Sequence, residues 1–375
     1  MEVPKSFCLW YSFFILAGCV VRLTIAHHQG KCEISRGRHR MGTNHAMLGH
    51  SYKNFTLSQA YDCHVKCFEE KCRCRAYQIW QKRCELLDED RFSAPKDFVN
   101  DAEYTYFDMN REFPNLKLCI NHCCNQNPCA HGGTCIELCG DAKVKFNCTC
   151  PTGYFGRLCH KRRPTSCKEQ LENDRRSSSA VYELFDPTTN SFYQVFCDFR
   201  SADVIIWTLV ESFSFSYKLE FRSETFLNNY PVNQQAFKWK KFRLSWSRMK
   251  AIADHSTHVR ATCNFDTDGL NYTDYLRAKF SDINVMNFSS HGCKKFEYVN
   301  IRGHDCINCT AYFGQNKYWH AHIDSYHGIA NCELKSTKAR SHPGGEDNFG
   351  WYETVNPIHR CTRNNTSTTQ WWFGE

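Results

Sequence analysis

Closely spaced cysteines and glycines fill one stretch of the chain, Cys124-Asn-Gln-Asn-Pro-Cys129-Ala-His-Gly-Gly-Thr-Cys135, followed by Cys148-Thr-Cys150-Pro-Thr-Gly-Tyr-Phe-Gly-Arg-Leu-Cys159. The glycines stand where tight backbone turns favour a residue that lacks a Cβ atom. A module of about 40 residues cannot bury enough apolar surface to be stable by itself. Disulfide bonds must therefore stabilise this stretch, which indicates that the chain folds in an oxidising compartment.

This stretch resembles an EGF-like domain, which we expect to cover residues 120–160. The resemblance implies the disulfides Cys124–Cys135, Cys129–Cys148 and Cys150–Cys159. Cys123 and Cys139 have no counterpart in that pattern, and a bond between them is one hypothesis. The calcium-binding type of this domain has acidic residues just before its first cysteine. Because residues 115–123 contain none, we expect no calcium site there.

The preceding region, residues 27–119, has a helical pattern followed by two short strand patterns. Apolar residues and cysteines three and four positions apart over 58–68 predict a helix that starts at Ser58. Residues 76–80 and 84–86 predict strands between polar turns. The cysteine spacing resembles the PAN/apple domain, in which a helix is attached to a small sheet. The resemblance implies the disulfides Cys32–Cys119, Cys63–Cys84 and Cys67–Cys74, with Cys72 as an added competitor of Cys74.

The last region, residues 161–375, begins with a basic segment at 161–164 that we interpret as an exposed linker. Apolar residues over 179–184, 196–199 and 204–210 predict strands of a buried sheet. The opening resembles the start of a fibrinogen-like C-terminal domain, which implies the disulfide Cys167–Cys197. The family's glycine-rich stretch and calcium loop are not recognisable, so we treat this region as a divergent relative.

The fold class that follows is α+β, multi-module and disulfide-rich. We expect a PAN/apple-like module, a small β-type EGF-like module and a divergent, β-rich fibrinogen-like C-terminal domain.

The N-terminus and the cysteine count predict secretion. Residues 1–26 combine Lys5, an apolar run and Thr24-Ile-Ala26, which is typical of a cleaved signal peptide; a retained N-terminal anchor is the alternative. The chain has 25 cysteines, a density typical of extracellular proteins. An odd number remains after removal of Cys8 and Cys19, which predicts an unpaired, capped or inter-chain cysteine. We expect no membrane span in the mature chain.

Seven Asn-x-Ser/Thr sequons predict N-linked glycans at Asn54, Asn147, Asn271, Asn287, Asn308, Asn364 and Asn365. The last two sequons overlap, so we expect only one of them to be used. The formal net charge is +8, and no aromatic–basic nucleic-acid motif accompanies it. A solvated surface with a slight basic excess is the plainer interpretation of this charge, and weak attraction to acidic polysaccharide is the alternative. The partners we expect are extracellular matrix proteins or acidic polysaccharides, and no nucleic acid.

Two histidines and a carboxylate, His320, His322 and Asp324, would share one face of a strand and could hold zinc or copper. A polar strand face is the plainer interpretation, and we favour it. Cys306-Ile-Asn-Cys309 has the spacing of half a zinc site or of a redox pair. Structural disulfides with the other cysteines of this region, Cys263, Cys293, Cys332 and Cys361, are the favoured interpretation.

Asp266, Asp268 and Asp274 suggest calcium but lack the spacing of a helical calcium loop, so a turn is favoured. We therefore predict no metal site and no cofactor. Aromatic residues near the end of the chain fit either a sugar-stacking surface or the edge of a core, and we favour the core: Trp351, Tyr352, Trp371, Trp372 and Phe373.

The sequence contains no Gly-x-Ser-x-Gly, His-Glu-x-x-His or phosphate-binding glycine loop, so we predict that the protein is not an enzyme. The order of modules and the segments 346–350 and 368–374 resemble secreted cnidarian proteins, among them coral skeletal organic matrix proteins with an EGF-like module. That resemblance implies a structural or interaction role in an extracellular matrix, including a mineralised one. The alternative is a calcium-dependent fibrinogen-like lectin or recognition protein.

Overall fold

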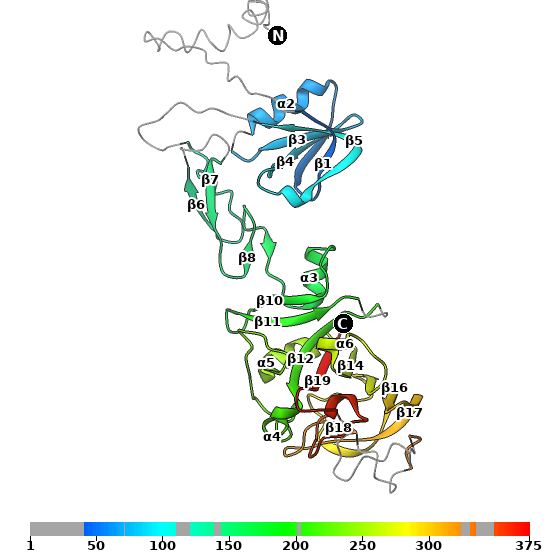
Figure 1. The fold of residues 1–375 in the computed structure, drawn as a ribbon. Helices are drawn as coiled ribbons and strands as arrows, with labels where there is room; N and C mark the ends of the chain where they lie inside the picture. Colours follow the sequence, from blue (N-terminus) through cyan, green and yellow to red (C-terminus); the bar gives the residue numbers. More distant parts are fainter. Residues whose placement is uncertain are drawn as a thin grey trace, which may run out of the picture. The chain divides into compact units, whose positions relative to one another are not determined.

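The computed structural model describes residues 41–70, 72–109, 121–138, 144–200, 204–323, 331–334 and 349–375. The chain forms two compact units, which divide between Thr149 and Cys150, inside the predicted 120–160 module (Figure 1). Several predictions fall outside the described residues: the signal peptide at 1–26, the bond Cys32–Cys119, and the roles of Cys139 and Asp324.

The N-terminal unit contains a five-stranded antiparallel sheet in the order β1-β5-β3-β4-β2. Its elements are β1 (Met41–Met47), β2 (Ser51–Thr56), β3 (Ala76–Trp80), β4 (Arg83–Leu87), the 3-10 helix η1 (Pro95–Asp97) and β5 (Phe98–Asp108). The strands predicted at 76–80 and 84–86 are confirmed by β3 and β4.

Helix α2 (Ala60–Glu69) packs on this sheet. It begins two residues after the predicted start at Ser58, because Asp62 caps it by accepting a hydrogen bond from the Gln59 amide at 2.9 Å. The cysteines of the helix, Cys63 and Cys67, are fully buried. One disulfide joins Cys63 of the helix to Cys84 in β4. A second joins Cys67 of the helix to Cys74, just before β3.

Two short hairpins follow, one in each unit. Strand β6 (Thr134–Glu137) pairs with β7 (Phe146–Thr149) in the N-terminal unit, and β8 (Tyr154–Phe155) pairs with β9 (Lys161–Arg162) in the C-terminal unit. The interpretation of 161–164 as an exposed linker holds only in part, because Lys161 and Arg162 are exposed but form β9, and Pro164 is buried. The Arg163 guanidinium lies 4.9 Å from the Phe155 ring centroid, and its amide donates to the Gly153 carbonyl at 2.9 Å. Cation–π contact and backbone pairing both order this segment.

The C-terminal unit is built on a ten-stranded antiparallel sheet in the order β10-β11-β12-β19-β14-β15-β16-β17-β18, with β13 paired to β12. The strands are β10 (Ala180–Asp186), β11 (Ser191–Asp198), β12 (Trp207–Ser214), β13 (Lys241–Arg243), β14 (His258–Cys263), β15 (Tyr275–Lys279), β16 (Ser290–Ile301), β17 (His304–Gln315), β18 (His322–Ile323) and β19 (Thr368–Gly374). The helices are α3 (Cys167–Asn173), η2 (Phe215–Tyr217), α4 (Lys218–Phe221), α5 (Trp246–Ala253), α6 (Phe265–Asp268) and η3 (Arg360–Thr362).

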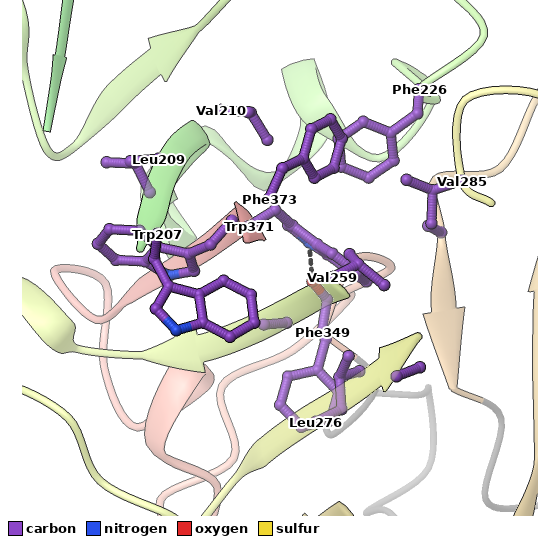
Figure 2. Close-up of a cluster of buried hydrophobic side chains, with 14 of the residues drawn as sticks. Trp207, Leu209, Val210, Phe226, Val259, Leu276, Val285, Phe349, Trp371 and Phe373 are labelled. Carbon is purple, nitrogen blue, oxygen red and sulfur yellow. Dashed lines mark hydrogen bonds between the residues drawn. The ribbon is translucent and has the colours of Figure 1, made fainter. Parts of the chain in front are cut away.

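The last strand, β19, lies in the middle of this sheet, between β12 and β14. Its aromatic residues Trp371, Trp372 and Phe373 are fully buried, as is Tyr352, which confirms the core interpretation for these four. Figure 2 shows Trp371 and Phe373 within this cluster. The Trp371 indole donates to the Phe349 carbonyl at 3.1 Å, so its polar group is satisfied. Trp351 differs, because it is only partly buried.

A buried charge lies inside this core. The Arg260 guanidinium carbon is 4.4 Å from the Trp207 ring centroid and 4.6 Å from that of Trp372. Its Nη2 atom is 2.8 Å from Asp198 Oδ2, so the charge is paired as well as stacked. A paired and stacked guanidinium can remain in an apolar interior because both its charge and its flat faces have partners.

Candidate functional site

An open pocket of about 580 Å³ lies on the C-terminal unit, where α6, the segment before β15, the β16–β17 turn and η3 meet. Its walls are Asp268, Asn271, Thr273, Asp274, Arg302, Gly303, His304, Ile358, Arg360 and Arg363. Three of these residues are arginines and two are aspartates. The pocket therefore combines positive charge with a smaller amount of negative charge.

The β16–β17 turn supplies one side of the pocket. Ile301 and His304 are paired, so only Arg302 and Gly303 form the loop, with φ of 52° and 82°. A two-residue hairpin loop with two positive φ values matches the twist of its strands and favours glycine. The turn is held in place because Asp274 Oδ1 accepts a hydrogen bond from the Arg302 amide at 2.6 Å.

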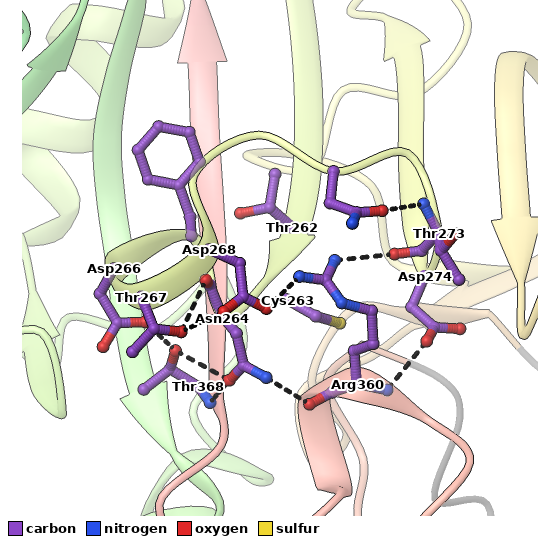
Figure 3. A network of polar contacts seen from close by, with 12 residues as sticks. Thr262, Cys263, Asn264, Asp266, Thr267, Asp268, Thr273, Asp274, Arg360 and Thr368 are labelled. Atoms are coloured by element: carbon purple, nitrogen blue, oxygen red, sulfur yellow. Dashed lines mark hydrogen bonds and ion pairs between the residues drawn. The ribbon is translucent and has the colours of Figure 1, made fainter.

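Arg360 holds the opposite side together (Figure 3). Its amide donates to Asp274 Oδ2 at 2.8 Å, and its guanidinium donates to the Thr273 carbonyl at 3.1 Å and to Asp268 Oδ2 at 2.5 Å. The hydrogen bond from Arg360 lowers the pKa of Asp268, although burial partly opposes it. Both carboxylates are therefore engaged by protein donors at the base of the pocket.

The third aspartate considered as a calcium ligand, Asp266, is also engaged. Its Oδ1 atom accepts hydrogen bonds from Thr368 Oγ1 at 2.5 Å and from Gln370 Nε2 at 3.3 Å. Calcium requires six to eight oxygen ligands around one point. In this arrangement Asp266, Asp268 and Asp274 face donor groups of the protein, including a guanidinium, which disfavours a cation between them.

Behind the pocket lies a fully buried histidine, His359, whose Nε2 is 3.6 Å from Asp274 Oδ1. Burial lowers the pKa of His359 to about 4, so the imidazole is neutral at physiological pH. His359 is also close to Cys263 and Cys361, with ligand atoms within 4.8 Å of one another. These two sulfurs are joined as a disulfide, so they are not thiolate ligands for a metal.

The pocket is best suited to an anionic group. Arginine presents a planar set of donors that matches carboxylate and sulfate oxygens in pairs. Arg363 is exposed, and Arg302 lines the pocket wall opposite η3. Sequence reasoning did not identify Arg302, Arg360 or Arg363, because no local spacing relates position 302 to position 360. The only signal was the Arg-Gly pair between two strand patterns, which indicates a hairpin turn.

The two histidines considered as zinc or copper ligands both contact other protein groups. His320 precedes β18 and is fully buried; its Nε2 is 2.6 Å from Glu211 Oε1 and its Nδ1 is 2.9 Å from the Ala321 carbonyl. His322 Nδ1 is hydrogen-bonded to the His320 carbonyl at 2.7 Å. Asp324, the third residue of that set, lies outside the described residues.

Glu211 also forms an ion pair with Arg243, and both side chains are fully buried. Burial opposes ionisation of Glu211, but the charges and hydrogen bonds of His320 and Arg243 outweigh it and lower the pKa of this carboxyl. Both ring nitrogens of His320 lie against oxygen atoms, Nε2 against the Glu211 carboxylate and Nδ1 against the Ala321 carbonyl. The three residues form a buried charged cluster that joins β12, β13 and the segment before β18.

All six predicted disulfide pairs that fall on described residues are bonded partners in the structure. The bonds are Cys63–Cys84, Cys67–Cys74, Cys124–Cys135, Cys129–Cys148, Cys150–Cys159 and Cys167–Cys197. Cys72 pairs with Cys123, so it does not replace Cys74, and the hypothesis of a Cys123–Cys139 bond is wrong. Among the described residues, the structure also joins Cys263 to Cys361, Cys293 to Cys332 and Cys306 to Cys309.

The asparagines of all seven sequons are exposed: Asn54, Asn147, Asn271, Asn287, Asn308, Asn364 and Asn365. N-glycosylation at these positions stays a prediction. One of them, Asn271, lies on the wall of the pocket. A glycan there would stand next to the arginines.

Comparison with known proteins identifies one module. The family model described as "EGF-like domain" matches residues 124–158. Porcine coagulation factor XII (Sus scrofa) is 31% identical over 126 residues, which is 33% of this chain and 18% of that protein. The chain thus spans less than a fifth of the length of this relative.

These matches and the many disulfides fit a secreted protein of several modules, one of them an EGF-like domain, that interacts with other molecules outside the cell. Among the residues that the structure describes, no helix is long and apolar enough to cross a membrane.

Proposed function

We propose that this protein is a secreted, non-enzymatic component of the extracellular matrix whose C-terminal unit binds acidic polysaccharide in the pocket described above. The observation that carries the proposal is the convergence of Arg302, Arg360 and Arg363 on one open pocket whose aspartates already have protein donors. The formal net charge of +8 supports the same class of partner.

The binding mechanism follows from the chemistry of the pocket wall. Sulfate and carboxylate groups along the polymer would accept paired, charge-assisted hydrogen bonds from the guanidinium groups. Arg360 is 6% exposed, and its two Nη atoms are held by Asp268 and by the Thr273 carbonyl, so it supplies a fixed positive charge at the base of the pocket while Arg302 and Arg363 supply the donors. Such preorganisation reduces the entropy that binding costs.

The other modules would act as protein-contacting surfaces. We propose that residues 27–119 form a PAN/apple-like module, residues 120–160 the EGF-like module, and residues 161–375 a divergent fibrinogen-like domain after removal of residues 1–26. Disulfides such as Cys72–Cys123 and Cys167–Cys197 support rigid modules of this kind. One cysteine beyond these pairs would be available for an inter-chain bond.

The first prediction concerns the pocket arginines. The double variant Arg302→Gln/Arg363→Gln should bind immobilised heparin at least about tenfold more weakly, because a hydrogen bond to a charged group contributes about 1.5–3 kcal/mol. Surface plasmon resonance at physiological salt measures the change. The hydrogen bond from the backbone amide of residue 302 to Asp274 does not depend on the side chain, so Gln at this position should leave the turn in place.

A matched control removes two positive charges elsewhere on the same unit. Arg175 and Lys238 are both exposed and do not line the pocket. Arg175→Gln/Lys238→Gln should retain nearly all of the affinity, since it lowers net charge without touching the pocket. Equal losses in the two double variants would mean that binding depends only on overall charge, and the pocket would have no special role.

The rival function is a calcium-dependent lectin. It requires that carboxylates such as Asp266 and Asp268 leave Thr368 and Arg360 to bind the ion. Our proposal expects heparin binding to be unchanged by a calcium chelator. Loss of all binding on chelation would favour the lectin instead.

The second prediction concerns location. We propose that the matrix is a mineralised one, in which this protein is a framework component because it lacks the Asp/Glu runs of an acidic nucleator. Mass spectrometry of the bleached and dissolved skeleton of the source organism should find its peptides inside the mineral. Peptides found only in soft tissue would contradict the mineral location. That result would not bear on the polysaccharide site, which the heparin-binding variants test separately.

A further inference from the structure

Strand β17 contains a disulfide between residues only three positions apart, Cys306 and Cys309. In a regular strand, side chains three positions apart point to opposite faces. The two sulfurs meet because Asn308 has a left-handed backbone, with φ of 50°. A non-glycine residue pays a conformational cost in that region, although asparagine tolerates it better than most.

The same residue interrupts the pairing of β16 with β17. The register includes Tyr298–Ile307 and Phe296–Cys309, and it omits the position of Asn308 between them. Opening of the disulfide would allow Asn308 to return to an extended backbone. The strand could then pair without a break, so the open form gains local structure that the closed form lacks.

This disulfide is accessible at Cys306, the residue that an incoming thiol would attack. Cys306 is only partly buried, whereas Cys309 is 6% exposed; Ile307 is 65% exposed, and Asn308 is exposed. By contrast, Cys263 and Cys361 are 1% and 0% exposed. A thiolate must reach a sulfur atom along the bond to attack it, so exposure decides which disulfides can exchange.

We propose that Cys306–Cys309 is a reversible thiol–disulfide exchange site. A thiol R–SH, attacking as its thiolate, bonds to Cys306 Sγ as the bond between Cys306 and Cys309 breaks. Cys309 leaves as the thiolate and takes up the proton, which gives a mixed disulfide of R with Cys306 and a free thiol at Cys309. Attack by Cys309 on the mixed disulfide releases R–SH and restores the original bond.

The fold around the site remains intact during this cycle. Strand β17 is paired with β16 over nearly its whole length, and Cys293–Cys332 ties the hairpin to a neighbouring segment. Because Cys306 and Cys309 are close in sequence, the open form keeps the two sulfurs near each other without closing a long loop. Re-formation of the bond is therefore local.

The test is a titration of the full-length protein with reduced glutathione, followed by alkylation and mass spectrometry. Cys306 and Cys309 should become alkylated or glutathionylated at a thiol concentration at least tenfold lower than any other pair. The relevant competitor is Cys293–Cys332, because Cys293 is exposed as well. If Cys293–Cys332 reacts first, or if the reaction begins only as the protein unfolds, the proposal is wrong.

Two variants distinguish the effect of the backbone conformation at position 308 from shielding of the disulfide by a glycan at that position. Asn308→Asp and Asn308→Gly both remove the sequon, but only glycine adopts positive φ without cost. Asn308→Gly should need several times more glutathione than Asn308→Asp to open the bond. Equal sensitivity of the two variants would contradict the proposal, since the left-handed residue would then have no influence on opening.

Discussion

Replacement of Glu211 by Gln should destabilise the C-terminal unit by about 3–5 kcal/mol, because removing one partner of a buried ion pair leaves the other charge uncompensated. Arg243 and His320 are both fully buried and both bond to this carboxylate. Gln has nearly the same volume as Glu, so the change isolates the charge. Chemical denaturation followed by tryptophan fluorescence measures it, since Trp207 and Trp371 lie in the same core.

The pH dependence of this effect has a definite sign. The pKa of Glu211 is lower in the folded state than its unfolded value of about 4.3. Its contribution to stability is therefore fully present above that unfolded value and is lost as pH falls through the folded-state pKa. The gap between wild type and Glu211→Gln should be large at pH 7 and should shrink in strong acid.

Asp254→Asn is the matched control, because it removes a carboxylate from the exposed pair Lys250–Asp254 on the same unit. Surface pairs of this kind contribute about 0.3–0.5 kcal/mol. A loss below about 1 kcal/mol for Glu211→Gln, comparable to the control, would mean that the buried cluster does not stabilise the fold through its charge.

The second large effect is expected from the disulfide Cys263–Cys361, which joins residues 98 positions apart. A loop of that length is expected to contribute about 4–5 kcal/mol by restricting the unfolded chain. The double variant Cys263→Ala/Cys361→Ala should therefore unfold at a much lower denaturant concentration. It should also lose heparin binding, because this bond fixes η3, which carries Arg360.

Cys306→Ala/Cys309→Ala provides the comparison, because it removes a bond that spans only three positions. The same entropy relation gives about 2 kcal/mol for so short a loop. The two double variants should therefore differ clearly in denaturation midpoint and in heparin affinity. If removal of either disulfide lowered the free energy of unfolding by the same amount, the stabilisation would not depend on loop length, contrary to this prediction.

Local features of the chain could be read from the sequence. The pattern over 58–68 predicts α2, and the buried strands β3 and β4 follow from their apolar residues. Aromatic residues such as Trp371 and Trp372 were correctly assigned to a core, because burying large rings is favourable wherever the partner strands come from. Each of these inferences depends on neighbours in sequence.

Features that depend on distant neighbours could not be read in this way. Segment 161–164 looked like a linker, yet Arg163 finds Phe155 and the Gly153 carbonyl only after the chain turns back. His320 looked like a metal ligand until Glu211, more than 100 positions earlier, was placed beside it. The pocket is the clearest case, since Arg302, Asp274 and Arg360 meet only because β19 returns to the middle of the sheet and η3, which precedes it, packs against β14 and β19.

Binding of acidic polysaccharide in the pocket around Arg302 and Arg360 can be followed by hydrogen–deuterium exchange of the full-length protein. The exchange is measured with and without a heparin oligosaccharide, in the presence of a calcium chelator. We expect slower exchange at residues 268–274, 302–304 and 358–363, with little change elsewhere in the unit. Protection at other segments, or protection that disappears with the chelator, would contradict it.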